Sequence, residues 1–127
     1  LGALPGSPLF DHKSGIDGII ENARNDLEAL QAAKVDAIMF GNENDRPYEF
    51  EVNVASTATA AYIIGKLRNE ITVPFGVNML WDPMSTIALR SATATTIPNG
   101  LRLELEVGSM RGIISNGIWA PFTGSIA

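Results

Sequence analysis

The stretch that decides the fold is Pro74–Pro83, PFGVNMLWDP, in which an apolar run is followed at once by a helix start. The run Pro74–Leu80 is almost wholly apolar, which is typical of a strand buried on both faces. Asp82 then offers a side-chain cap, and Pro83 fixes φ at the first helical position. A buried strand that leads directly into a helix is the basic unit of a parallel α/β protein.

The same two kinds of element precede this stretch. Ile16–Leu30 carries apolar residues at steps of three and four, which predicts an amphipathic helix. Ser14 and Asp17 at its start resemble a capping box, with Asp in place of the usual Glu or Gln. Val35–Phe40 is another nearly continuous apolar run, so we expect a second buried strand that ends in a polar loop.

The alternation continues on both sides of the central stretch. A second helical stripe covers Ala60–Ile71 and is entered through the polar segment Asn53–Thr59, while Met84–Ala92 gives a third helix its apolar face. Leu101–Val107 predicts a further strand. The sequence therefore predicts an α/β fold of parallel β/α units.

The composition excludes several kinds of partner and of catalytic or metal site. The 127 residues include 9 basic and 14 acidic side chains, a net charge of -5, so a nucleic-acid partner is not expected. The absence of Cys and the single His exclude thiolate catalysis, disulfides, and Cys-type or His-rich metal sites. Leu1–Phe10 has no basic segment and contains two prolines, so we expect no targeting segment there. The longest uncharged run, Gly112–Ala127, falls short of the roughly 20 apolar residues that a transmembrane helix needs.

Three strings together resemble a known family: ALPGSPLFD (Ala3–Asp11), VDAIMFGNE (Val35–Glu43) and, most specifically, PFGVNMLWDP (Pro74–Pro83). They are similar to the BtpA/SgcQ family, which is related to a photosystem I biogenesis factor and to products of bacterial sugar-utilisation gene clusters. The resemblance implies a TIM-type (β/α)8 barrel of the ribulose-phosphate-binding kind. It holds over about residues 1–94, and residues 95–127 diverge from the family.

The length sets a further expectation, since a complete barrel of this type needs about 250 residues. We therefore expect residues 1–127 to form one partial β/α-barrel domain, about half a barrel, from a fragment or a truncated product. An unclosed sheet leaves strand edges open, which predicts self-association.

Candidate site residues follow from the barrel, because side chains at the carboxyl ends of its strands face the site. Five polar residues occupy such positions: Asn42, Glu43, Asn78, Arg102 and Glu104. Glu43 is the candidate general base, and the other four are candidates for substrate binding. No metal site or cofactor is assigned.

Two further residues receive a structural interpretation. Asp82 stands where a helix cap is required, so a ligand contact is the less favoured reading. His12, in the loop Phe10–Gly15, is expected to be a surface residue.

The resemblance implies a barrel protein that, in its complete form, binds or converts a small polar or phosphorylated, sugar-type metabolite at the strand carboxyl ends. We expect a cytoplasmic location. Whether it is an enzyme stays open at this point. One alternative is a non-catalytic, peripheral membrane biogenesis factor of the photosystem I assembly type. Another is a truncated product without a function of its own.

Overall fold

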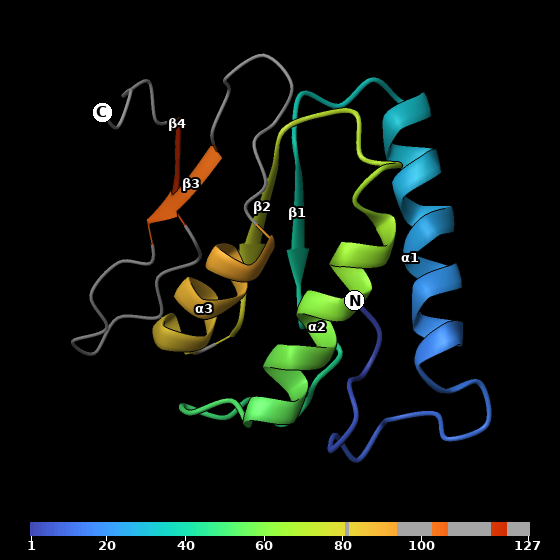
Figure 1. Ribbon diagram of the computed structural model, residues 1–127, viewed down its shortest axis with the longest axis vertical. Helices are drawn as coiled ribbons and strands as arrows, with labels where there is room; N and C mark the ends of the chain where they lie inside the picture. Colours follow the sequence, from blue (N-terminus) through green and yellow to red (C-terminus); the bar gives the residue numbers. More distant parts are fainter. Residues whose placement is uncertain (81, 94–102, 107–117, 122–127) are drawn as a thin grey trace.

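The structure of the chain is a computed structural model that describes residues 1–80, 82–93, 103–106 and 118–121. Along these residues three helices and four short strands follow one another (Figure 1). Their bounds are α1 Gly15–Ala32, β1 Ile38–Gly41, α2 Val54–Leu67, β2 Phe75–Asn78, α3 Pro83–Thr93, β3 Leu103–Glu106 and β4 Ile118–Pro121. The predicted mixed α/β architecture is confirmed.

β1 and β2 form a parallel two-stranded sheet, as the sequence predicts. Ile38 pairs with Phe75 and Phe40 with Val77, and all four side chains are buried. The rings of Phe40 and Phe75 meet edge to face, with their centroids 5.8 Å apart. Parallel strands require a crossover connection, and α2 provides it.

The core is centred on α2, which lies between α1 and α3 (Figure 1). Its inward face presents four apolar side chains with 0% exposure, Ala60, Ile63, Ile64 and Leu67. Leu27 of α1 and Leu89 of α3 pack into the same cluster. Each fully buried Leu or Ile stabilises the fold by about 1.5–3 kcal/mol, so this cluster holds the helices together.

No helix in the described ranges has both the length and the apolar character needed to cross a bilayer.

One edge of β1 is paired with β2, and within the described residues no strand pairs with its other edge. An open strand edge favours pairing with another chain. The self-association expected from the sequence stays a prediction, as does the half barrel, since the parallel sheet described here has two strands.

The start of α1 differs from the expected capping box. Ser14 makes no cap with its side chain, and its hydroxyl instead donates to Asp11 Oδ2 at 2.7 Å. Its backbone is already helical, with φ -84° and ψ -23°, whereas a capping residue needs an extended backbone. The capping-box prediction for Ser14 and Asp17 is therefore wrong.

α2 begins earlier than the apolar stripe indicates. Asn53 is its cap, with an extended backbone and a side chain that accepts from Ser56 N at 2.8 Å. After Val54 the first turns consist of Ala, Ser and Thr, whose small side chains show no apolar periodicity. The polar segment Asn53–Thr59 is thus the first part of the helix rather than its approach.

The strand expected over Leu101–Val107 does not extend the parallel sheet. β3 pairs antiparallel with β4 in a separate two-stranded sheet, with Leu103 opposite Pro121 and Glu106 opposite Ile118. The sequence Leu101–Val107 alternates apolar and charged residues, a pattern typical of an antiparallel strand with one solvated face. A strand is confirmed over Leu103–Glu106, but the prediction that it continues the parallel series is wrong, since its partner is β4.

Candidate functional site

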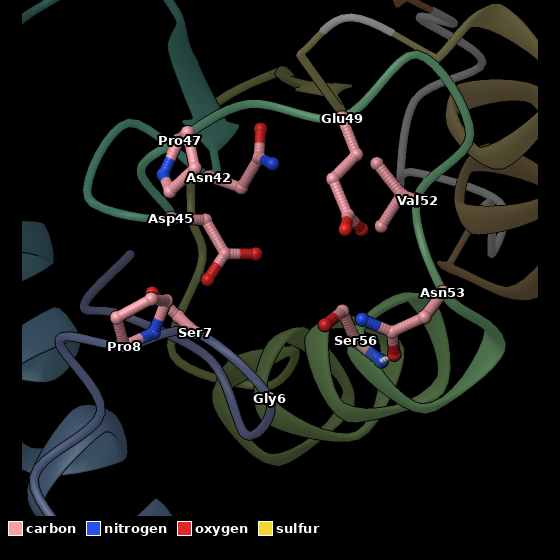
Figure 2. A pocket seen from close by; sticks show the side chains of 10 residues that line it. All are labelled: Gly6, Ser7, Pro8, Asn42, Asp45, Pro47, Glu49, Val52, Asn53 and Ser56. Atoms are coloured by element: carbon pink, nitrogen blue, oxygen red, sulfur yellow. Dashed lines mark hydrogen bonds between the residues drawn. The ribbon is translucent and has the colours of Figure 1, made fainter.

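A polar cavity of about 190 Å³ lies at the carboxyl end of β1 (Figure 2). Three segments enclose it: the N-terminal loop, the loop that follows β1, and the first turn of α2. The lining residues are Gly6, Ser7, Pro8, Asn42, Asp45, Pro47, Glu49, Val52, Asn53 and Ser56. The cavity therefore occupies the end of the sheet at which β/α proteins place their sites.

The N-terminal loop is fixed against the rest of the cavity by Leu4. Its side chain is fully buried in the core, and its amide donates to Asp45 Oδ1 at 3.0 Å. The hydroxyl of Ser56 donates to Pro5 O at 3.3 Å, which ties the same loop to α2. Gly6 then turns the chain with φ +102°, a conformation that L side chains rarely adopt.

Asn42 connects the ends of the two parallel strands. Its Nδ2 donates to Leu80 O at 3.2 Å, and its Oδ1 accepts from Leu80 N at 2.7 Å. The residue is 1% exposed, so this pair of bonds satisfies an amide that burial would otherwise make costly. The structure thus places Asn42 at the predicted position, where it lines the cavity and also joins the loops after β1 and β2.

Asp82 fixes the loop after β1 from the other side. Its Oδ1 accepts from the amides of Met84 and Ser85, which confirms the predicted helix cap. Its Oδ2 accepts from the Ser85 hydroxyl at 2.6 Å and from Val52 N at 2.9 Å. Because Val52 lines the cavity, Asp82 helps to shape it without being one of its lining residues.

The charge of Asp82 is stabilised by these bonds. Burial raises the pKa of this carboxyl, but the hydrogen bonds from Ser85, Val52 and Met84 outweigh burial and hold the pKa below its ordinary value of 3.8. The carboxylate is therefore the form that the folded protein favours.

Glu43 and Asn78 both lie outside the lining of this cavity. Both flank Gly41: a Cβ built on Gly41 would lie 3.5 Å from Asn78 O and 3.8 Å from Glu43 Oε1. Glu43 is exposed, and its Oε2 accepts from the Tyr48 hydroxyl at 3.3 Å. Asn78 is half-buried and is paired in register with Gly41.

The remaining sequence-based candidates are placed as follows. Arg102 lies outside the described residues, and so does the side chain of Glu104, whose backbone belongs to β3. His12 is exposed, as expected, and the centroid of its ring lies 4.8 Å from the centroid of the Phe10 ring. In the described ranges, no group of three or more His, Cys, Asp or Glu side chains is placed to hold a metal ion.

Sequence reasoning missed five polar side chains that line the cavity: Asp45, Glu49, Ser7, Asn53 and Ser56. The first lies in GNENDRP, which reads as a polar loop, and the last two lie in a segment interpreted as the approach to a helix. No pattern in the sequence indicates that residues 4–8 fold back over the loop that follows β1. The helix-cap preference of Asn is the one signal that could have placed Asn53 at a helix start.

Comparison with known proteins gives a consistent family match. The model of the BtpA family matches residues 1–121. The chain is 50% identical over 93 residues to the putative sgc region protein SgcQ of Escherichia coli, covering 73% of this chain and 35% of that protein. An uncharacterised protein of Thermococcus kodakarensis is 35% identical over 77 residues, covering 61% of this chain and 29% of that protein. The photosystem I biogenesis protein BtpA of Synechocystis is 29% identical over 97 residues, covering 75% of this chain and 33% of that protein. The chain thus spans about a third of the length of these relatives, and no solved structure matches it.

Proposed function

The chain belongs to the BtpA family, and on that premise we propose that it binds a small polar metabolite of the sugar or sugar-phosphate kind in the cavity at the carboxyl end of β1. The observation that carries the proposal is the position of this cavity. The loop after β1, the N-terminal loop and the start of α2 line it at the carboxyl end of a parallel strand, which is the end at which β/α folds bind their ligands.

The size and the lining of the cavity support a small ligand. Its volume of about 190 Å³ is below the roughly 300–1,000 Å³ of sites for drug-sized ligands, which favours a small compound over a nucleotide. Most of its lining side chains are amides, hydroxyls and carboxylates. Such groups orient a ligand through hydrogen bonds, which favours a polyhydroxylated compound.

The roles predicted from the sequence remain part of this proposal. Glu43 is proposed as the general base, and Asn42, Asn78, Arg102 and Glu104 as substrate-binding residues. The position of Glu43 Oε1 and of the backbone carbonyl of Asn78 beside Gly41, at the strand ends, supports these roles. A ligand that extends from the cavity across the end of β1 would meet both.

A pair of matched variants tests the proposal. Glu49 points into the cavity and Glu51 does not line it, yet both are exposed glutamates of the same loop (Figure 2). Glu49→Trp fills the cavity, whereas Glu51→Trp makes the same change of charge and bulk outside it. We expect ribose 5-phosphate to give saturation-transfer NMR signals with the unaltered chain and with Glu51→Trp, and to lose them with Glu49→Trp. Equal signals from both variants, or no signal from the unaltered chain with any of a panel of sugars and sugar phosphates, would refute the proposal.

A second function is favoured by one observation, an apolar groove of about 490 Å³ between α2 and α3. Val54 and Met84 on its rim are 83% and 71% exposed, and Ile87 nearby is 52% exposed. Exposed apolar patches mark contacts with other proteins or with membrane surfaces. We therefore keep a peripheral assembly role, of the kind that the name of the Synechocystis relative describes, as the second proposal.

Sedimentation with lipid vesicles separates the two functions. If the assembly role holds, the chain pellets with the vesicles at low and at high salt, and replacing Val54 and Met84 by Ser abolishes pelleting. A chain that stays in the supernatant under both conditions contradicts the assembly role and leaves a cytoplasmic metabolite-binding protein as the proposal.

A further inference from the structure

The cavity contains polar groups of two kinds, those engaged inside the protein and those left for a ligand. Asn42 uses both ends of its amide on Leu80. Within the described residues, three groups of the lining make no internal hydrogen bond: the Oδ2 oxygen of Asp45, the carboxylate of Glu49 and the Nδ2 amino group of Asn53. These three groups are the ones that a ligand would meet.

Their arrangement is convergent. In Figure 2 the carboxylates of Asp45 and Glu49 reach into the cavity from two parts of the same loop, and the amide of Asn53 faces them from the start of α2. Leu4 N holds Oδ1 of Asp45, which leaves Oδ2 as the oxygen available to a ligand. Asn53 is likewise fixed through Oδ1, which caps Ser56 N, so that its amino group is the free end.

This set of groups discriminates between ligand ends. Ionised carboxylates only accept hydrogen bonds, and sugar hydroxyls can donate them; the amino group of Asn53 can then donate to a hydroxyl oxygen. A phosphate group donates nothing when fully ionised and is repelled by two carboxylates at short range. The amino end of α2, which would otherwise attract an anion, already has Asn53 as its cap.

We propose that this cavity is the subsite for the uncharged, hydroxyl-bearing end of the ligand, with Asp45, Glu49 and Asn53 as its recognition residues and with any phosphate group held outside it. The proposal rests on the function proposed above and adds the orientation of the ligand.

NMR titration of the full chain tests this orientation. The dissociation constants of three probes are measured: D-ribose, ribose 5-phosphate and inorganic phosphate. Asp45→Asn keeps the acceptor for Leu4 N and removes the charge, and Glu49→Gln removes the charge of a side chain that has no partner among the described residues. Glu51→Gln is the control for overall charge. Because each site variant loses a charged hydrogen bond to the ligand, the dissociation constants of D-ribose and of ribose 5-phosphate are expected to rise by about tenfold. Inorganic phosphate should bind no better to the unaltered chain than to Glu51→Gln.

The outcomes distinguish this inference from the proposed function. If D-ribose does not bind and both site variants bind ribose 5-phosphate and inorganic phosphate more tightly, the cavity holds the phosphate and the orientation is wrong, while the proposed function stands. If none of the sugars binds the unaltered chain, both fail. Should Asp45→Asn not fold, Glu49→Gln, an exposed position, decides the question alone.

Discussion

The side chain of Asn42 is bonded at both ends to the backbone of Leu80, through Nδ2 to the carbonyl at 3.2 Å and through Oδ1 to the amide at 2.7 Å. This pair of bonds connects the chain just beyond β1 with the chain just beyond β2. The two loops at the carboxyl ends of the parallel strands are therefore held in one fixed relation, and the cavity beside them depends on it.

Replacing Asn42 by Ala should destabilise the protein strongly. The change removes a nearly fully buried side chain and leaves the amide and the carbonyl of half-buried Leu80 without these partners, at a cost of about 1–3 kcal/mol in the free energy of unfolding. Urea denaturation measures this loss. Asn25→Ala, on the exposed face of α1, is the matched control and should change the free energy by less than about 0.5 kcal/mol. Similar losses of unfolding free energy in both variants would show that the bonds of Asn42 to Leu80 do not stabilise the fold.

The contacts of Asp82 predict a pH dependence of stability. Its pKa is lowered in the folded state, so the unfolded chain takes up the proton first as the pH falls. The contribution of Asp82 is therefore fully present above about pH 4, the pKa range of an unperturbed Asp, and is lost as the pH falls through the lower folded pKa. Asp82→Asn should be less stable than the unaltered chain at pH 7, and the gap should narrow below about pH 4.

Melting temperatures measured from roughly pH 2.5 to 7, a range that brackets this titration, check the prediction. Asp36→Asn, an exposed position, serves as the control and should follow the unaltered chain throughout. A constant difference between Asp82→Asn and the unaltered chain at every pH would contradict the assigned role of the carboxylate.

The N-terminal loop should be an integral wall of the cavity rather than a loose extension. Leu4 is 0% exposed and Leu9, in the same loop, is 62% exposed. Leu4→Ala should therefore cost about 2–5 kcal/mol in the free energy of unfolding, whereas Leu9→Ala should cost less than about 0.5 kcal/mol. Denaturant midpoints for the two variants measure the difference, and equal midpoints would show that the loop does not pack on the core.

The sequence predicts those parts of the fold that leave a periodic or a continuous apolar signal. The stripe of α1, the two buried runs around Phe40 and Val77, and the cap at Asp82 are all confirmed. The start of α2 is missed because its first turns consist of small residues, and the capping box fails because Ser14 is already helical.

The candidate site is predicted only in part, because a cavity depends on long-range contacts. Asn42 is identified from its position after a strand, and it does line the cavity. Asp45 and Asn53 come to the same cavity only because the loop around Leu4 folds over them, through contacts between residues about forty positions apart. Short-range patterns in a sequence do not predict such long-range contacts.

The most direct test of the central claim is amide chemical-shift mapping during a titration with ribose 5-phosphate. If the metabolite binds at the carboxyl end of β1, the largest shifts fall on the backbone amides of the cavity lining, namely Ser7, Asn42, Asp45, Asn53 and Ser56. The amides of α1 around Asn25, on the exposed face of that helix, should stay unchanged. Shifts confined to α1 or to the groove between α2 and α3, or no shifts at all, would contradict the claim.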